Sequence, residues 1–297
     1  MISGLTLIFI TGVLWGLVGI IFSRTVSRKE NFHAFMLLSS FFCAAGAWAF
    51  LPDYTKIISG DFSGTLQLLA VMTGVAFLGS TGFLFMKNAM NNDGHHGIIW
   101  TIAQSAMIIP FIASFILWDE KITLFKVLGL ITILLSLFMF GMKKSESLSD
   151  PDKKNGKKWF LFALSAFIFL GISQAFSTMP SHWTGWHDNA SLRVPVYSLS
   201  AFLFWILYFL LKSSNVKFIF LPAFSYALAG LLGQVTLYKS LDIMSARNMT
   251  SIVYPASIAV SILIFFLYSI FIIREKSGAG VRTGFLFALA GIIMISI

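Results

Sequence analysis

Residues 143–158 read KKSESLSDPDKKNGKK and form the one strongly polar linker of this chain. Five apolar stretches lie on each side of it, and each is long enough to cross a bilayer, which takes roughly 20 apolar residues. The predicted helices are Gly4–Ser23, Ala34–Leu51, Leu66–Met86, Gly97–Leu117, Leu124–Met142, Trp159–Met179, Val194–Leu211, Phe218–Tyr238, Met249–Ile273 and Gly280–Ile297. The sequence therefore predicts an all-α integral membrane protein with ten transmembrane helices.

The amino-acid composition favours the same class of protein. Of the 297 residues, 57% are hydrophobic and 11% are charged, and the mean hydropathy is +0.85. A soluble domain carries about 25% charged residues, so a soluble globular fold is not expected. The net charge of +9 comes from Lys and Arg in short loops between the apolar stretches, where they can face lipid headgroups. We therefore expect the lipid bilayer as a partner and no nucleic acid.

Neither the N-terminus nor the cysteine content predicts processing or cross-linking. No basic residue precedes the first apolar stretch, so a retained first helix is expected rather than a cleaved signal peptide. The single cysteine, Cys43, lies inside an apolar stretch, where it is expected to serve as a packing residue, and it allows no intrachain disulfide. No metal-ligand spacing is present, and neither a metal nor a cofactor is expected.

The distribution of basic residues predicts the orientation in the membrane. Successive loops between the predicted spans lie on alternate faces of the membrane. The loops on one face hold 15 of the 21 Lys and Arg residues, and the positive-inside rule identifies that face as cytoplasmic. Both termini would then lie outside and the linker inside. The short tails favour a bacterial inner membrane.

The position of the linker predicts internal symmetry. It separates a first unit, residues 1–142, from a second, residues 159–297, with residues 143–158 between them. Because each unit has an odd number of spans, the second enters the membrane upside down relative to the first. Inverted repeats of this kind are common in secondary transporters.

The two units also end in a similar way. The first ends with LWDEKIT (117–123) and a last helix that contains Gly129, and the second ends with IREK (273–276) and a last helix that contains Gly284 and Gly291. The second unit departs from the first by having SGAG (277–280) after its turn. The acidic residues Glu120 and Glu275 could hold a helix N-terminus or a neighbouring lysine, or they could take part in proton coupling.

This arrangement resembles the drug/metabolite transporter superfamily, in its EamA-type ten-helix branch, over essentially the whole chain. The resemblance implies a basket in which helices 1, 3, 4, 6, 8 and 9 surround a cavity and helices 5 and 10 are peripheral. It also implies a carrier for small organic solutes.

Polar and aromatic side chains inside the spans are the candidate solute-binding residues, because polar groups in a membrane normally face the bundle interior. Three of them, His96, Trp100 and Gln104, are spaced four residues apart and so share one face of a helix. The other candidates on the spans are Trp15, Gln174, Gln234 and Tyr254. Amides and aromatic faces suit a polar, mostly uncharged solute. The same residue types also join helices without binding any solute.

Three ionisable residues have two interpretations each. Lys87 and Lys239 end the third and eighth predicted spans, where each could extend its ammonium group to the headgroups or attract an anionic solute. His96 could couple transport to a proton, or it could be an interfacial histidine. Pro110 and Pro255 lie inside spans and are candidate hinges.

These patterns predict a secondary active transporter that moves a small polar organic solute, such as a sugar, an amino acid or a related metabolite, by alternating access. The chain would act as a monomer or homodimer, with a proton as one candidate coupling ion. The alternatives are a multidrug or metabolite exporter of the same fold, a membrane-embedded lipid-modifying enzyme and a passive channel. No phosphate-binding loop is present, so nucleotide hydrolysis is not expected, and we predict that the chain is no enzyme.

Overall fold

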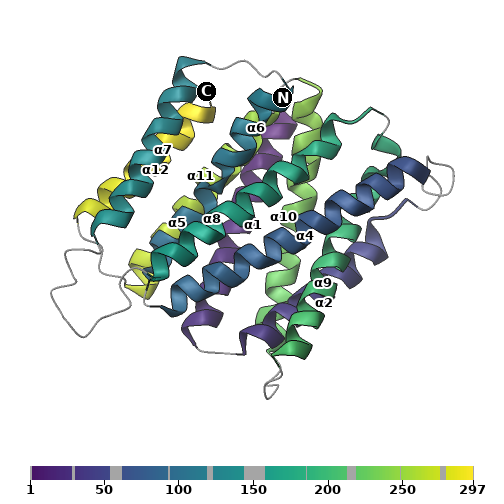
Figure 1. The fold of residues 1–297 in the computed structure, drawn as a ribbon, viewed down its shortest axis with the longest axis horizontal. Helices are drawn as coiled ribbons and strands as arrows, with labels where there is room; N and C mark the ends of the chain where they lie inside the picture. Colours follow the sequence, from purple (N-terminus) through teal and green to yellow (C-terminus); the bar gives the residue numbers. More distant parts are fainter. Residues whose placement is uncertain are drawn as a thin grey trace.

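The computed structural model, drawn in Figure 1, describes residues 2–28, 31–53, 62–92, 94–118, 123–143, 158–184, 186–212, 219–247, 249–274 and 279–296. Every regular element in these ranges is a helix. Eight helices within them are long and apolar enough to span a bilayer, so the chain is a multi-pass integral membrane protein. Most of the polar linker and both Glu120 and Glu275 lie outside the described residues.

The helices follow the predicted order along the chain. The first unit contains α1 (Ile2–Ser27), α2 (Phe32–Phe50), α4 (Phe62–Asn91), α5 (His96–Gln104), the 3-10 turn η1 (Ser105–Met107), α6 (Ile108–Trp118) and α7 (Leu124–Lys143). The second contains α8 (Lys158–Thr178), η2 (Met179–His182), η3 (Trp186–Leu192), α9 (Arg193–Leu211), α10 (Phe220–Ser245), η4 (Thr250–Ile252), α11 (Val253–Tyr268), the π-helical η5 (Ser269–Ile273) and α12 (Ala279–Ser296). Each predicted range overlaps one of these helices or a contiguous group of them.

The fourth and ninth predicted spans are not continuous α-helices. The 3-10 turn η1 separates α5 from α6 and comes just before Pro110. The 3-10 turn η4 likewise precedes α11 and Pro255. Proline has no N–H to donate to the carbonyl four residues earlier, and its ring clashes with that carbonyl, so the backbone tightens in the turn before it.

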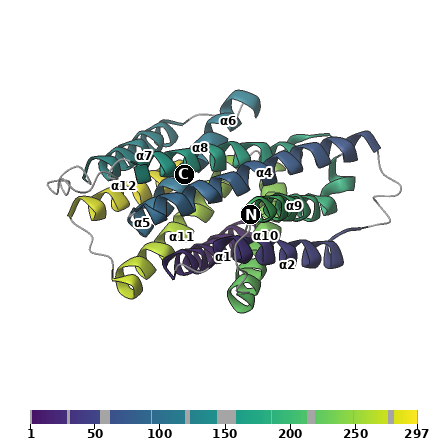
Figure 2. The same ribbon diagram turned by 60° about the horizontal axis from the view of Figure 1, so that its bottom comes forward.

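The fifth and tenth predicted spans correspond to α7 and α12. Their described apolar stretches, Leu124–Ser136 and Arg282–Met294, are shorter than the other eight. The two helices pack side by side at the edge of the bundle, as both ribbon views show (Figures 1 and 2). Their contact is close at Gly291, where an added Cβ would lie 2.7 Å from the carbonyl oxygen of Gly129.

One end of the bundle, called the first end below, is where α1 and α4 begin and α10 ends. Gly4 near the start of α1 faces Met244 at the end of α10, where an added Cβ would lie 3.0 Å from the Met244 Cε. Thr65 near the start of α4 donates a 3.0 Å hydrogen bond to Asn189, just before α9. The opposite end, the second end, is where α2 begins and α9 ends, and there the Phe32 ring packs 5.8 Å from the Trp205 ring.

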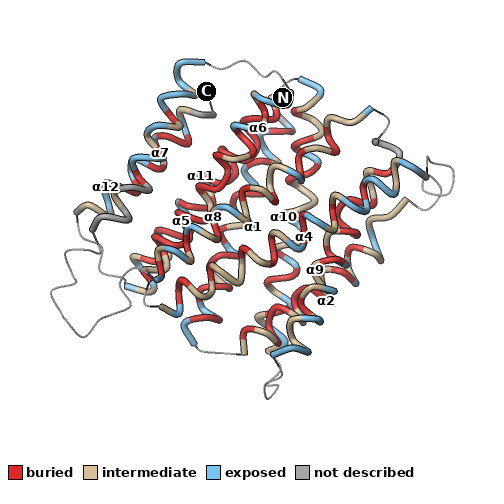
Figure 3. The backbone as a smooth tube through the Cα atoms, viewed as in Figure 1, coloured by how far each residue is buried: buried red, intermediate tan, exposed pale blue. Residues whose placement is uncertain are grey.

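The two units interlock instead of forming separate bodies. Helix α1 of the first unit packs against α10 and α11 of the second, and α4 packs against α8 and α9. Buried and exposed residues alternate along the helices (Figure 3), so each helix presents one face to the bundle and another outward. The outward faces carry large apolar side chains such as Phe9, Leu161 and Leu207, which suits contact with lipid.

A larger side chain at Gly291 is expected to push α7 and α12 apart. The substitution Gly291→Leu should lower the unfolding free energy by about 1–3 kcal/mol, as overpacking does elsewhere. Thermal unfolding of the purified protein in detergent measures this change. The neighbouring substitution Ala290→Leu is the control, because Ala290 lies on the exposed face of α12. Equal melting temperatures for the two variants would contradict the close contact.

Candidate functional site: a cavity between eight helices

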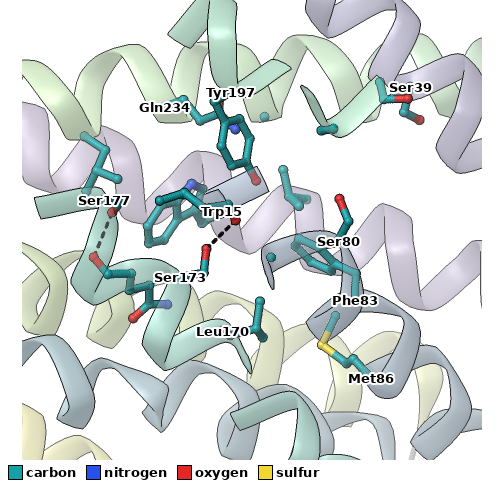
Figure 4. A pocket seen from close by; sticks show the side chains of 18 of the residues that line it. Trp15, Ser39, Ser80, Phe83, Met86, Leu170, Ser173, Ser177, Tyr197 and Gln234 are labelled. Carbon is teal, nitrogen blue, oxygen red and sulfur yellow. Dashed lines mark hydrogen bonds between the residues drawn. The ribbon is translucent and has the colours of Figure 1, made fainter. Parts of the chain in front are cut away.

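A cavity of about 180 Å³ lies between α1, α2, α4, α5, α8, α9, α10 and α11. Figure 4 shows its wall from close by, with Trp15 of α1, Ser80 of α4, Ser173 of α8 and Gln234 of α10 around the open space. Both units contribute four of these helices. Neither α7 nor α12 contributes a lining residue among those described.

Six of the nine predicted site residues line this cavity. Their shared property is a polar or aromatic side chain inside a span, and they are Trp15, Trp100, Gln104, Gln174, Gln234 and Tyr254. These residues come from α1, α5, α8, α10 and α11, so the fold brings together side chains up to 239 positions apart in sequence, from 15 to 254. The sequence pattern predicted that these side chains face the interior of the bundle.

Two glycines let the indole rings pack close to their neighbours. The Trp100 ring lies against Gly19 of α1, where an added Cβ would be 2.6 Å from the indole. On its other side the ring stacks on Phe265, with centroids 5.1 Å apart. The Trp15 ring lies in the same way against Gly233 of α10, where an added Cβ would be 3.0 Å away. Close helix contact at small residues is a common feature of membrane bundles.

Three predicted site residues do not line the cavity. His96 lies at the start of α5, and its Nδ1 is 2.8 Å from the Ser23 Oγ. Lys87 lies near the end of α4, with its Nζ 5.2 Å from the centre of the Phe32 ring. Lys239 is exposed on α10. The stripe of His96, Trp100 and Gln104 is therefore divided: its last two members face the cavity and its first does not.

The second and seventh predicted helices line the cavity as well, which the family resemblance did not imply. Ser39 and Ser40 come from α2, and Tyr197 and Trp205 come from α9. Their signal in the sequence was present but weak, because serines and aromatic residues are frequent in all ten spans. Only the packing of α2 and α9 against α10 and α4 turns these side chains toward the cavity.

A buried arginine next to the cavity was missed from the sequence. Arg193, the first residue of α9, is only 1% exposed although it begins a membrane-length helix. Its Nη1 lies 3.5 Å from the Asp242 Oδ1 and donates a 2.9 Å hydrogen bond to Ser181. Its Nη2 donates to the carbonyl oxygen of Ser177. The guanidinium carbon lies 4.0 Å from the centre of the Tyr238 ring.

This arginine network forms part of the cavity wall at the first end. Ser177, Tyr238 and Tyr254 all line the cavity. The Ser177 Oγ is 2.6 Å from the Tyr254 hydroxyl, so the network joins α8, α9, α10 and α11. The sequence did offer one signal, an arginine directly before a long apolar stretch. A loop position at the membrane surface accounts for such an arginine equally well, since surface arginines are common there.

The Arg193 and Asp242 side chains are expected to show energetic coupling. Arg193→Met and Asp242→Asn should each lower the melting temperature, because a single removal leaves the other charge without its partner. The double variant should be more stable than the sum of the two effects predicts, by about 1–3 kcal/mol. The measurement is a double-mutant cycle: thermal unfolding, in detergent, of the unmodified protein, the two single variants and the double variant. The control is Lys239→Met, because Lys239 is an exposed residue on α10, the helix that carries Asp242. Strictly additive effects would show that the two charges do not interact.

The sequence matches no protein-family model, and no curated protein matches it. Among solved structures, a crystal structure of a protein superposes on 99% of this chain and 97% of its own length, with a TM-score of 0.65. The two sequences are 13% identical, so this similarity shows a shared fold alone.

Proposed function

We propose that the chain is a secondary carrier that moves a small polar organic solute across the membrane by alternating access. The observation that carries this proposal is the cavity, which lies inside a membrane-type bundle and takes its wall from four helices of each unit. Aromatic faces, amides and hydroxyls line it, and this is the usual composition of a small-solute site. The alternative function, a multidrug or metabolite exporter of the same fold, would use the same cavity. The direction of transport would then depend on the gradient of the solute or of the coupled ion.

Two cation and ring pairs at opposite ends of the bundle support an inverted repeat. At the first end Arg193, at the start of α9, lies over Tyr238 near the end of α10. At the second end Lys87, near the end of α4, lies over Phe32 at the start of α2. If the units are inverted repeats, α2 corresponds to α9 and α4 to α10, and the two pairs occupy equivalent places with cation and ring exchanged. Alternating access would then loosen one pair at a time.

The resemblance to drug/metabolite transporters is part of the same proposal. Its expectation that helices 5 and 10 are peripheral is supported by α7 and α12, which pack together at the edge. Ten spans, a cytoplasmic linker and outside termini also belong to the proposal, as does a coupled proton. The bacterial inner membrane remains the expected location.

Filling the cavity should stop transport without disturbing the fold. Gly230 lines the cavity, and an added Cβ there meets no atom within 4 Å, so Gly230→Phe has room to enter the open space. Counterflow of labelled sugars, amino acids and drugs into proteoliposomes is the measurement. We expect Gly230→Phe to lower it about tenfold or more, which corresponds to about 1.4 kcal/mol.

Gly74→Phe is the matched control for this experiment. Gly74 lies on the exposed face of α4 and also has no atom within 4 Å of an added Cβ. Counterflow by this variant should equal that of the unmodified protein. Equal loss in both variants, or a flux that never saturates and shows no trans-stimulation, would exclude a carrier that works through this cavity.

The ten-span topology predicts on which face single cysteines react. In a Cys43→Ala background, cysteines at Lys121 and Lys153 should react with a membrane-impermeant thiol reagent from opposite faces, because α7 lies between them. A cysteine at Lys276 and one added after Ile297 should likewise lie on opposite faces of the membrane, on either side of α12. Labelling of both members of a pair from one face would mean that the helix between them does not cross.

A further inference from the structure

We infer that the solute is uncharged at neutral pH, carries both hydrogen-bond donors and acceptors, and has an apolar face. This inference rests on the proposed function and concerns the same cavity. Of the small polar molecules proposed above, only this class would be transported. Zwitterionic amino acids, organic anions and cationic drugs would not be substrates.

The described residues give the cavity a wall without charge. Among the described residues, those that line the cavity are aromatic, aliphatic, glycine, methionine, serine or glutamine, and none has a charged side chain. This is notable in a chain with 21 Lys and Arg residues. Moving an ion from water into such a site costs several kcal/mol when no opposite charge receives it. Since about 1.4 kcal/mol is a tenfold change in affinity, a charged solute is strongly disfavoured.

The charged side chains near each end of the cavity, Arg193 and Lys87, already have contacts of their own. Arg193 is paired with Asp242 and lies over the Tyr238 ring, and it is Tyr238, not the guanidinium, that lines the cavity. Lys87 at the second end lies over Phe32, and neither residue belongs to the lining. An anionic solute would have to remove Arg193 from Asp242 in order to gain a partner.

Several buried polar atoms around the cavity lack a hydrogen-bond partner. In the described part of the chain, three cavity residues carry such atoms: the acceptors Oε1 of Gln174 and Gln234, and the donor Nε1 of Trp100. A buried polar group that stays unpaired costs about 1–3 kcal/mol. These atoms are themselves buried, but their side chains line the cavity, so a turn of the amide or of the indole would let a hydroxyl or a carboxamide on the solute donate to the glutamine oxygens and accept from the indole. A hydrocarbon solute would leave all three atoms unpaired.

The aromatic walls and the volume supply the last constraints. The Trp15 and Tyr254 rings lie 6.0 Å apart at 34°, and both line the cavity, so they offer apolar surface to a flat or ring-shaped solute. The volume of about 180 Å³ would hold on the order of ten water molecules, at roughly 10–15 Å³ each. A solute of about the size of a monosaccharide or of a single aromatic ring with one polar group fits this space.

Two sets of molecules of matched shape test the inference by counterflow in proteoliposomes. The first set is benzamide, benzoate and benzamidine, which share one frame and are neutral, anionic and cationic. The second is glucose, glucuronate and glucosamine. We expect exchange of the neutral member of at least one set, with its charged siblings at least about tenfold slower. A charged sibling that is exchanged as fast as the neutral one overturns the solute class and leaves the carrier function standing. No exchange in either set counts against both.

A charge placed on the cavity wall tests whether the cavity makes this selection. In Gln234→Glu a carboxylate enters the wall, so the preference should shift about tenfold toward benzamidine or glucosamine. Gln174→Glu gives the same readout if Gln234→Glu does not fold. The control is Gln67→Glu, because Gln67 is exposed on α4 and lies outside the cavity. An unchanged preference in both cavity variants would overturn the inference.

Discussion

The structure depends on one constraint: the hydrocarbon core of a membrane holds no water to bond a polar group, so the protein must satisfy such groups itself. Helices do this for the backbone, and every regular element in the described residues is a helix. Many hydroxyl groups follow the same rule: Thr11, Ser39 and Ser257, for example, donate to the carbonyl oxygen four residues earlier. Some buried polar atoms of the described residues still lack a partner, and three of them, on Trp100, Gln174 and Gln234, belong to residues that line the cavity.

The same constraint explains the arginine network. A guanidinium buried among helices is stable only with an acid and further acceptors, and Arg193 has Asp242, Ser181 and the Ser177 carbonyl oxygen. Because these partners belong to α8, η2 and α10, the charge fixes the relative position of helix ends from different parts of the second unit. The wall residues Tyr238 and Tyr254 are held by the same contacts.

Close contact at glycines gives the bundle its interior shape. Gly19 and Gly233 lie against the indoles of Trp100 and Trp15, which turn toward the space between the units. At the edge, Gly291 brings α12 against α7, away from the cavity. Small residues therefore do two things here: they close the outer helix pair, and they leave room beside the inner helices for large aromatic rings.

The sequence alone determined the helical class and the order of the helices, because apolar length is a local property. It also predicted Trp15, Trp100, Gln104, Gln174, Gln234 and Tyr254 as candidates, since polar groups within a span face inward. It underestimated α4, a helix of 30 residues, because hydropathy reports contact with lipid. The hydrogen bonds of the helix continue beyond the apolar stretch, as the bond from the Asn92 N–H to the Asn88 carbonyl oxygen shows.

Only the tertiary structure decided which of the candidates meet. It placed Lys87, His96 and Lys239 away from the cavity, added α2 and α9 to its wall and buried Arg193 against Asp242. Each of these results depends on contacts between helices far apart in sequence, such as α2 with α9 and α9 with α4. Helical periodicity fixes the angle of a side chain around its own axis, but the rotation of that axis toward its neighbours is set by packing across the whole bundle.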